Sequence, residues 1–119
     1  MKTVLSLGQC TFDHAQLDRA FRDLAKIIPV SDEKGALKLL EQKPFDLVLV
    51  NREFDEDGAS GIEFIKNCIP LLNAKGIPAM LVSNFPEAQA QAINAGALAG
   101  FGKAELSTKK MAEVLARLG

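Results

Sequence analysis

Cysteine is scarce in this chain of 119 residues, and Cys10 and Cys68 are too few and too far apart for a disulfide framework or a zinc site. Lysine and arginine number 14 against 15 acidic residues, so the basic excess of a nucleic-acid-binding protein is missing. No apolar run approaches the roughly 18 residues needed to span a bilayer. The first eight residues hold too short an apolar core for a secretory signal. We therefore expect a cytoplasmic protein with no nucleic-acid or membrane partner.

The composition is that of an ordinary globular protein, with 48% apolar and 24% charged residues. Its length predicts a single domain over residues 1–119. Short apolar runs predict strands at residues 4–7, 26–30, 46–50, 77–82 and 97–101, and these runs alternate with helical patterns. Pro29 cannot donate to a sheet ladder, so the second strand is expected at an edge. The expected helix N-caps are Asp13, Ser31 and, for the last helix, Ser107 or Thr108.

Strict alternation of five strands and five helices predicts an α/β fold with a parallel sheet covered on both faces. With the second strand at an edge, a flavodoxin-like (βα)5 three-layer sandwich in strand order 2-1-3-4-5 fits best. Binding sites of such sheets lie beyond the carboxyl ends of the strands. This prediction brings five residues around one crevice: Gly8, Gln9, Asn51, Ser83 and Lys103.

"DLVLVN", "GIEFI", "IPAMLVS" and "NAGALAGFGKAEL" follow one another along the chain, and this ordered set is similar to the receiver domain of bacterial response regulators. "DLVLVN" resembles the strand that ends in the phospho-accepting aspartate, and Gly61 of "GIEFI" matches the glycine that opens the third helix. "IPAMLVS" resembles the strand that ends in threonine or serine, here Ser83. "NAGALAGFGKAEL" matches the segment that carries the family's lysine, here Lys103. The resemblance covers essentially the whole chain and implies two-component signalling.

The departures from the family pattern fall on its phosphorylation chemistry. The acidic pair that holds magnesium in receivers is Gly8 and Gln9 here, and the acceptor position is Asn51, whose amide is not a nucleophile. At the positions that form the phosphorylation pocket of the family, the charged residues are therefore one lysine and no carboxylate. Aspartyl phosphorylation needs a carboxylate and a metal ion. We therefore expect an atypical pseudo-receiver with no metal, no cofactor and no enzymatic activity.

Other residues near the crevice leave alternatives open. The acidic run Glu53, Asp55, Glu56 and Asp57 is either a solvated loop, a partner for Lys103, or a source of substitute ligands or a displaced acceptor. Cys10 is either a redox-sensitive thiol near a helix start or a plain half-buried cysteine. With the family's carboxylates missing, Lys103 and Ser83 are expected to attract a weakly bound anion.

A receiver-like domain that is not phosphorylated is expected to act by binding a partner through its surface. Receivers commonly dock partners through helix 4, strand 5 and helix 5, and the resemblance implies the same face for a signalling partner or a second copy. Alanines are frequent there, and Gly100 replaces the family's aromatic residue. Part of the alanine set is expected to pack against the sheet. The candidate interaction residues are Ala88, Ala92, Gly100, Lys109 and Lys110, with a shallow groove expected beside Gly100.

Three functions follow from these observations. The first is a phosphorylation-independent protein–protein interaction module. The second is a response regulator phosphorylated at a shifted residue, Asp55 or Asp57. The third is a sensor that binds a small anion or nucleotide in the crevice. Asn51→Asp alone is expected to restore little phosphorylation, whereas adding Gly8→Asp and Gln9→Asp is expected to regain some.

Overall fold

The computed structural model describes residues 1–118 and has five parallel strands in the order β2-β1-β3-β4-β5. The predicted fold class and strand order are confirmed, and the strand that contains Pro29 lies at an edge. The strands are β1 (Lys2–Leu7), β2 (Ala25–Val30), β3 (Leu47–Asn51), β4 (Ala79–Val82) and β5 (Leu98–Phe101). The helices are α1 (Thr11–Ala20), α2 (Glu33–Gln42), α3 (Gly61–Lys75), α4 (Pro86–Asn94) and α5 (Thr108–Ala116), with a short 3-10 turn at Lys103–Glu105.

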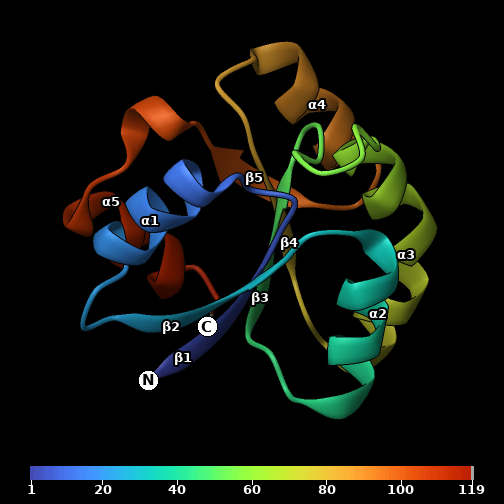
Figure 1. Ribbon diagram of the computed structural model, residues 1–119, viewed down its shortest axis with the longest axis horizontal. Helices are drawn as coiled ribbons and strands as arrows, with labels where there is room; N and C mark the ends of the chain where they lie inside the picture. The colour runs from blue at the N-terminus through green and yellow to red at the C-terminus, as the bar shows by residue number, and fades with distance from the viewer. Residues whose placement is uncertain (119) are drawn as a thin grey trace.

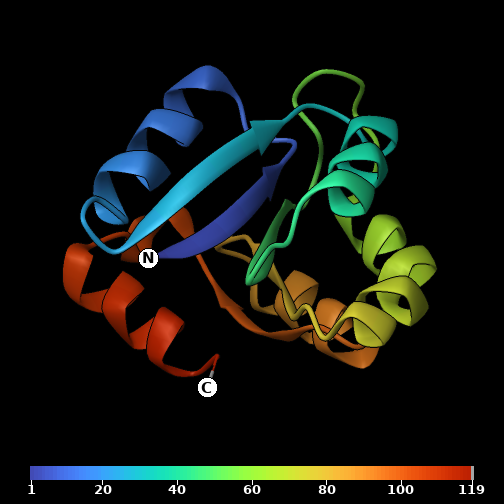
Figure 2. The same cartoon turned by 90° about the horizontal axis from the view of Figure 1, so that it is seen from below.

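The helices cover the sheet on both faces, with α1 and α5 on one side and α2, α3 and α4 on the other (Figures 1 and 2). Residues 47–50 of β3 are fully buried and alternate between two apolar cores. Leu47 and Leu49 face the α1–α5 side, whereas Val48 and Val50 face the other three helices. The first four residues of this central strand are all apolar, as expected of a strand whose two faces are both covered.

Two of the predicted helix caps are wrong. Cys10 rather than Asp13 is the N-cap of α1, and its Sγ accepts the Asp13 N–H at 3.4 Å. Asp32 rather than Ser31 caps α2, since its carboxylate accepts the N–H of Gly35. Of the two caps predicted for the last helix, Ser107 is the one that caps α5. No helix within residues 1–118 is long and apolar enough to cross a membrane.

Candidate functional site

The predicted crevice exists at the carboxyl ends of the strands as two adjoining hollows of about 240 and 300 Å³. Both hollows are lined by Asn51, Glu53 and Lys103. Ser83 lines the smaller hollow, and its Oγ accepts the Phe85 N–H at 3.1 Å at the start of α4. Gln9 lines neither hollow, and neither of its buried amide atoms has a hydrogen-bond partner within residues 1–118. Of the five residues predicted to meet, three therefore line the crevice directly.

Asn51 joins the two loops that border the crevice. Its Nδ2 donates to the carbonyl oxygen of Gly8 at 3.0 Å and to that of Glu53 at 2.7 Å. The Gly8 carbonyl also accepts the Asp55 N–H at 2.9 Å. An amide donor is required at this position because both partners are acceptors, and a carboxylate has no proton to donate. Asn51 is thus a structural clamp between the β1–α1 and β3–α3 loops.

Gly8 contributes to the crevice through its backbone. Its φ of 83° is one that residues with a side chain rarely adopt, and an added Cβ would collide with the Phe54 ring. Phe54 is 2% exposed, and its ring meets that of Phe64 edge-on with centroids 6.4 Å apart. A phenylalanine from the β3–α3 loop therefore packs where an acidic side chain on residue 8 would begin.

Lys103 forms an ion pair that sequence reasoning missed. Its Nζ lies 2.5 Å from a carboxylate oxygen of Asp13 on α1, and not against Glu53 or Asp55. The larger hollow is lined by three acidic residues, Asp13, Glu53 and Asp55, so the crevice holds carboxylates although the family's own positions supply none. Folding supplies these charges from α1 and the β3–α3 loop, outside the family's positions. No group of three or more metal-ligating side chains occurs within the described part of the chain.

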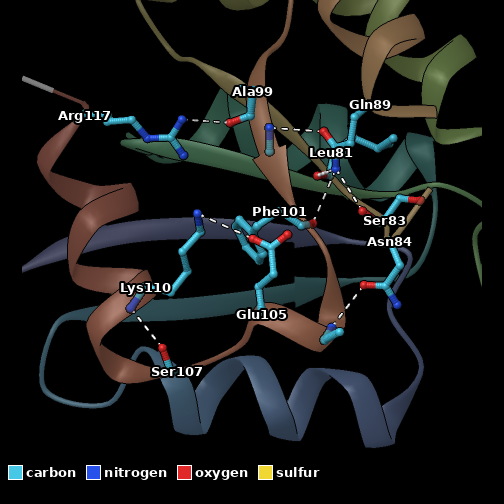
Figure 3. A network of polar contacts seen from close by, with 12 residues as sticks. Leu81, Ser83, Asn84, Gln89, Ala99, Phe101, Glu105, Ser107, Lys110 and Arg117 are labelled. Carbon is cyan, nitrogen blue, oxygen red and sulfur yellow. Dashed lines mark hydrogen bonds and ion pairs between the residues drawn. The ribbon is translucent and has the colours of Figure 1, made fainter. Parts of the chain in front are cut away.

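The side chain of Gln89 links α4 to the β4–β5 edge by hydrogen bonds (Figure 3). The ladder has a bulge, since Met80 pairs with Leu98 while Val82 pairs with Phe101. Gln89 Nε2 lies 2.9 to 3.4 Å from three backbone carbonyl oxygens, those of Leu81, Ser83 and Phe101. Its Oε1 accepts the Gly100 N–H at 3.1 Å. One amide thus contacts four backbone groups beside the bulge, and of these the Phe101 carbonyl also accepts the Ser83 N–H at 3.0 Å.

The close approach of the β4 backbone explains why residue 100 is a glycine. A Cβ at Gly100 would collide with the Leu81 carbonyl oxygen and press on the Gln89 amide. The groove expected there is therefore filled by backbone and by Gln89. Asn84 makes a second link, because its Oδ1 accepts the Ala104 N–H at 3.1 Å (Figure 3).

The predicted interaction face needs a further correction. Ala88 and Ala92 are 6% and 0% exposed, since their i, i+4 spacing directs both into the core shared with α3. Larger side chains are exposed beside them, with Ile93 at 46% and Leu98 at 41%. Lys109 is exposed, and Lys110 pairs with Glu105 at 3.5 Å. The face is therefore aliphatic and basic, and its alanines mostly serve the interior.

The residues that sequence reasoning missed carried weak signals. Phe54 is the one large apolar side chain in an otherwise polar loop, which indicates a buried anchor. Asp13 follows β1 closely enough to face its carboxyl end, but its place before an apolar helical pattern equally predicts an N-cap. Gln89 lies one residue from Ala88 in a helix of alanine and glutamine, so nothing in its pattern indicated a contact with the sheet.

Comparisons with known proteins agree with this geometry at the level of the fold. No protein-family model matches the chain, and no curated protein matches it by sequence. Among solved structures, chemotaxis response regulator CheY4 of Vibrio cholerae superposes with a TM-score of 0.78 at 18% identity, over 100% of this chain and 99% of that one. The receiver domain of NtrX from Brucella abortus gives 0.82 at 16% identity, over 97% and 96%.

Another NtrX structure from Brucella abortus gives a TM-score of 0.83 at 15% identity, over 98% of this chain but only 27% of that one. The chain thus spans about a quarter of that longer protein. At these identities the likeness establishes architecture, and the sheet order and helix layers agree with it. The chain has the fold of response-regulator receiver domains.

Proposed function

We propose that this chain is an atypical receiver domain that acts in two-component signalling as a phosphorylation-independent protein–protein interaction module. The observation that carries the proposal is the role of Asn51, whose amide donates to the Gly8 and Glu53 carbonyls. The side chain at the acceptor position therefore links the β1–α1 and β3–α3 loops by hydrogen bonds. Phosphoryl transfer to a carboxylate has no nucleophile there.

The engagement of Lys103 supports the same proposal. In the receiver pattern this lysine stands ready for a phosphoryl group, but here its Nζ lies against the Asp13 carboxylate. An anion or nucleotide in the crevice would compete with that ion pair and with the carboxylates of Glu53 and Asp55. An anion sensor is therefore less well supported than an interaction module, and no catalytic activity is part of the proposal.

The Gln89 contacts support a docking face that does not depend on phosphorylation. They connect α4 to both β4 and β5 through bonds that involve no crevice residue except the backbone of Ser83. The proposed face is formed by α4, β5 and α5, with Ile93, Leu98 and Lys109 exposed on it. A signalling protein or a second copy of the chain would bind there without a prior chemical change.

Incubation with acetyl phosphate and Mg²⁺, followed by intact-mass measurement, tests phosphorylation independence. We expect no mass gain. A gain of one phosphoryl group would refute the proposal and favour a shifted acceptor, of which Asp55 is the better placed because it lines the hollow that holds Lys103. Asp55→Asn and Asp57→Asn would then identify the modified residue.

Sedimentation of the wild type and Leu98→Glu tests self-association through this face. A dimer that Leu98→Glu dissociates would identify the partner as a second copy. The exposed Leu71 on α3 supplies a control, and Leu71→Glu should leave the association state unchanged.

A further inference from the structure

A groove of about 670 Å³ lies between the start of α3 and the start of α4 and borders the crevice, with which it shares Arg52, Glu53 and Phe85. Ile62 from α3, and Phe85, Pro86 and Ala88 around the start of α4, form its apolar lining. Phe85 is 57% exposed although it is a large aromatic side chain. Exposed apolar area concentrated in a concave surface indicates a binding site.

The Phe85 ring is held in place for contact. The guanidinium carbon of Arg52 lies 5.0 Å from the ring centroid, a cation–π arrangement. This stacking limits the motion of both side chains while more than half of the Phe85 surface stays exposed. An anchor that is already ordered loses little conformational entropy when a partner covers it.

Acidic residues border the groove. Glu53 and Gly58 of the β3–α3 loop line it, and Asp55, Glu56 and Asp57 lie on the same loop, with Asp55 lining the larger hollow of the crevice. Glu87 lines the opposite wall, on α4. Arg52 is the positive side chain of the lining, and none of these five exposed carboxylates forms an ion pair within residues 1–118.

The acidic loop has a defined shape. Glu53 and Ser60 pair across its base, and the Phe54 and Gly58 N–H groups donate to the Ala59 and Phe54 carbonyl oxygens at 2.9 and 2.8 Å. The buried Phe54 ring fastens the loop to the core. The carboxylates are therefore presented from a folded loop, next to the apolar lining.

From this combination we propose that the groove docks a basic amphipathic segment of a partner protein, with apolar side chains against Ile62 and Phe85 and lysines or arginines beside the acidic loop. Nucleic acid is excluded as the occupant because its phosphates would meet the carboxylates. A symmetric dimer through the groove would bring two identical acidic loops together, which like-charge repulsion opposes. The groove lies on the α3 side of α4, so this proposal does not depend on the α4–β5–α5 face.

The test uses a short fluorescein-labelled peptide with lysines and leucines at amphipathic helical spacing, and two reference peptides. One reference replaces lysine by glutamate, and the other replaces leucine by serine. We expect anisotropy to show binding of the first peptide alone, with amide chemical shifts changing at residues 52–62 and 85–91. Affinity should fall with added salt, because charge screening weakens attraction to the acidic residues.

Two variants locate the binding. Phe85→Ala should lower the affinity by about tenfold or more, as expected for a central aromatic anchor. The double change Glu53→Lys, Glu87→Lys should lower it by a similar factor. Phe12→Ala is the matched control, since Phe12 is 69% exposed at the start of α1, and it should leave the affinity unchanged. Unaltered urea midpoints would show that the variants remain folded.

Several outcomes would overturn the proposal. These are absence of binding, equal binding of the serine or glutamate peptide, or chemical shifts confined to residues 93–100. Concentration-dependent dimerisation that Phe85→Ala abolishes would instead assign the groove to a second copy. None of these results bears on acetyl-phosphate labelling, so the groove and the proposed function can fail separately.

Discussion

Replacing Asn51 by aspartate restores the carboxylate that receivers phosphorylate, yet we expect this substitution to destabilise the protein. The Asn51 amide donates to the Gly8 and Glu53 carbonyls at 3.0 and 2.7 Å. An ionised carboxylate would lose both bonds and face two carbonyl oxygens at close range. Losing two hydrogen bonds costs about 2 kcal/mol at a typical net value of ~1 kcal/mol each.

The charge adds a pH-dependent cost. The hollow beside Asn51 already holds the carboxylates of Asp13, Glu53 and Asp55, and Lys103 is paired with Asp13. This surrounding raises the folded-state pKa of the introduced carboxyl above its unfolded value of about 3.9. Each unit of that rise adds ~1.4 kcal/mol of destabilisation once the group is ionised in both states. The total is about 3 kcal/mol near neutral pH for a one-unit rise.

The sign of the pH dependence follows from the raised pKa. Below about pH 3 the carboxyl is protonated in both the folded and unfolded states and still donates one bond, so Asn51→Asp lies closest to the wild type there. Its deficit grows as pH rises from the unfolded-state pKa to the folded-state pKa and is constant above the latter. Urea unfolding of both proteins across this range measures the difference. Asn51→Ala is the control, since it loses the two bonds without adding a charge, and its deficit should not change with pH.

A variant Asn51→Asp as stable as the wild type at neutral pH would refute the clamp assignment. A deficit equal to that of Asn51→Ala at every pH would refute the electrostatic part alone. The structure also argues against the recovery expected from sequence for the change at residues 8, 9 and 51 together. A Cβ at Gly8 collides with Phe54, so the introduced aspartate there would disrupt the loop that it is meant to complete.

Three further predictions concern packing. Gly8→Ala should lower the free energy of unfolding, measured in urea, by about 2–3 kcal/mol, because of the positive φ and the displaced Phe54 ring. A loss under about 0.5 kcal/mol would show that the ring moves freely. Gln89→Ala should lower the free energy of unfolding by about 2–3 kcal/mol and speed amide hydrogen exchange at Gly100. The control Gln91→Ala, at an exposed position of the same helix, should do neither. Unchanged exchange at Gly100 would contradict the Gln89 assignment. Burial, with a smaller contribution from the charge of Glu33, raises the pKa of the Cys68 thiol above its ordinary value, so less thiolate forms at a given pH. Ellman's reagent should therefore modify Cys68 only after unfolding in urea, and Cys10→Ser removes the other thiol so that early reaction of Cys68 would be detected directly.

The order of apolar runs and helical patterns was sufficient to predict the parallel sheet, its strand order and the edge position of β2. These features depend on spacing along the chain and on the missing N–H of Pro29, both of which are visible in the sequence. The positions of Asn51, Ser83 and Lys103 at the crevice follow from the same pattern, because residues after parallel strands meet at one edge of the sheet.

The partners of those residues were decided by tertiary structure. Asp13 reaches Lys103 across 90 positions of chain, and the carbonyls that Asn51 binds are set by how two loops pack on Phe54. Gln89 contacts the sheet beside a bulge in β5, where its Oε1 accepts the Gly100 N–H. Periodicity indicates which face of an element is buried, but a specific contact depends on the distances between elements. Only the packed fold sets those distances, and with them the charge and the free surface of this protein.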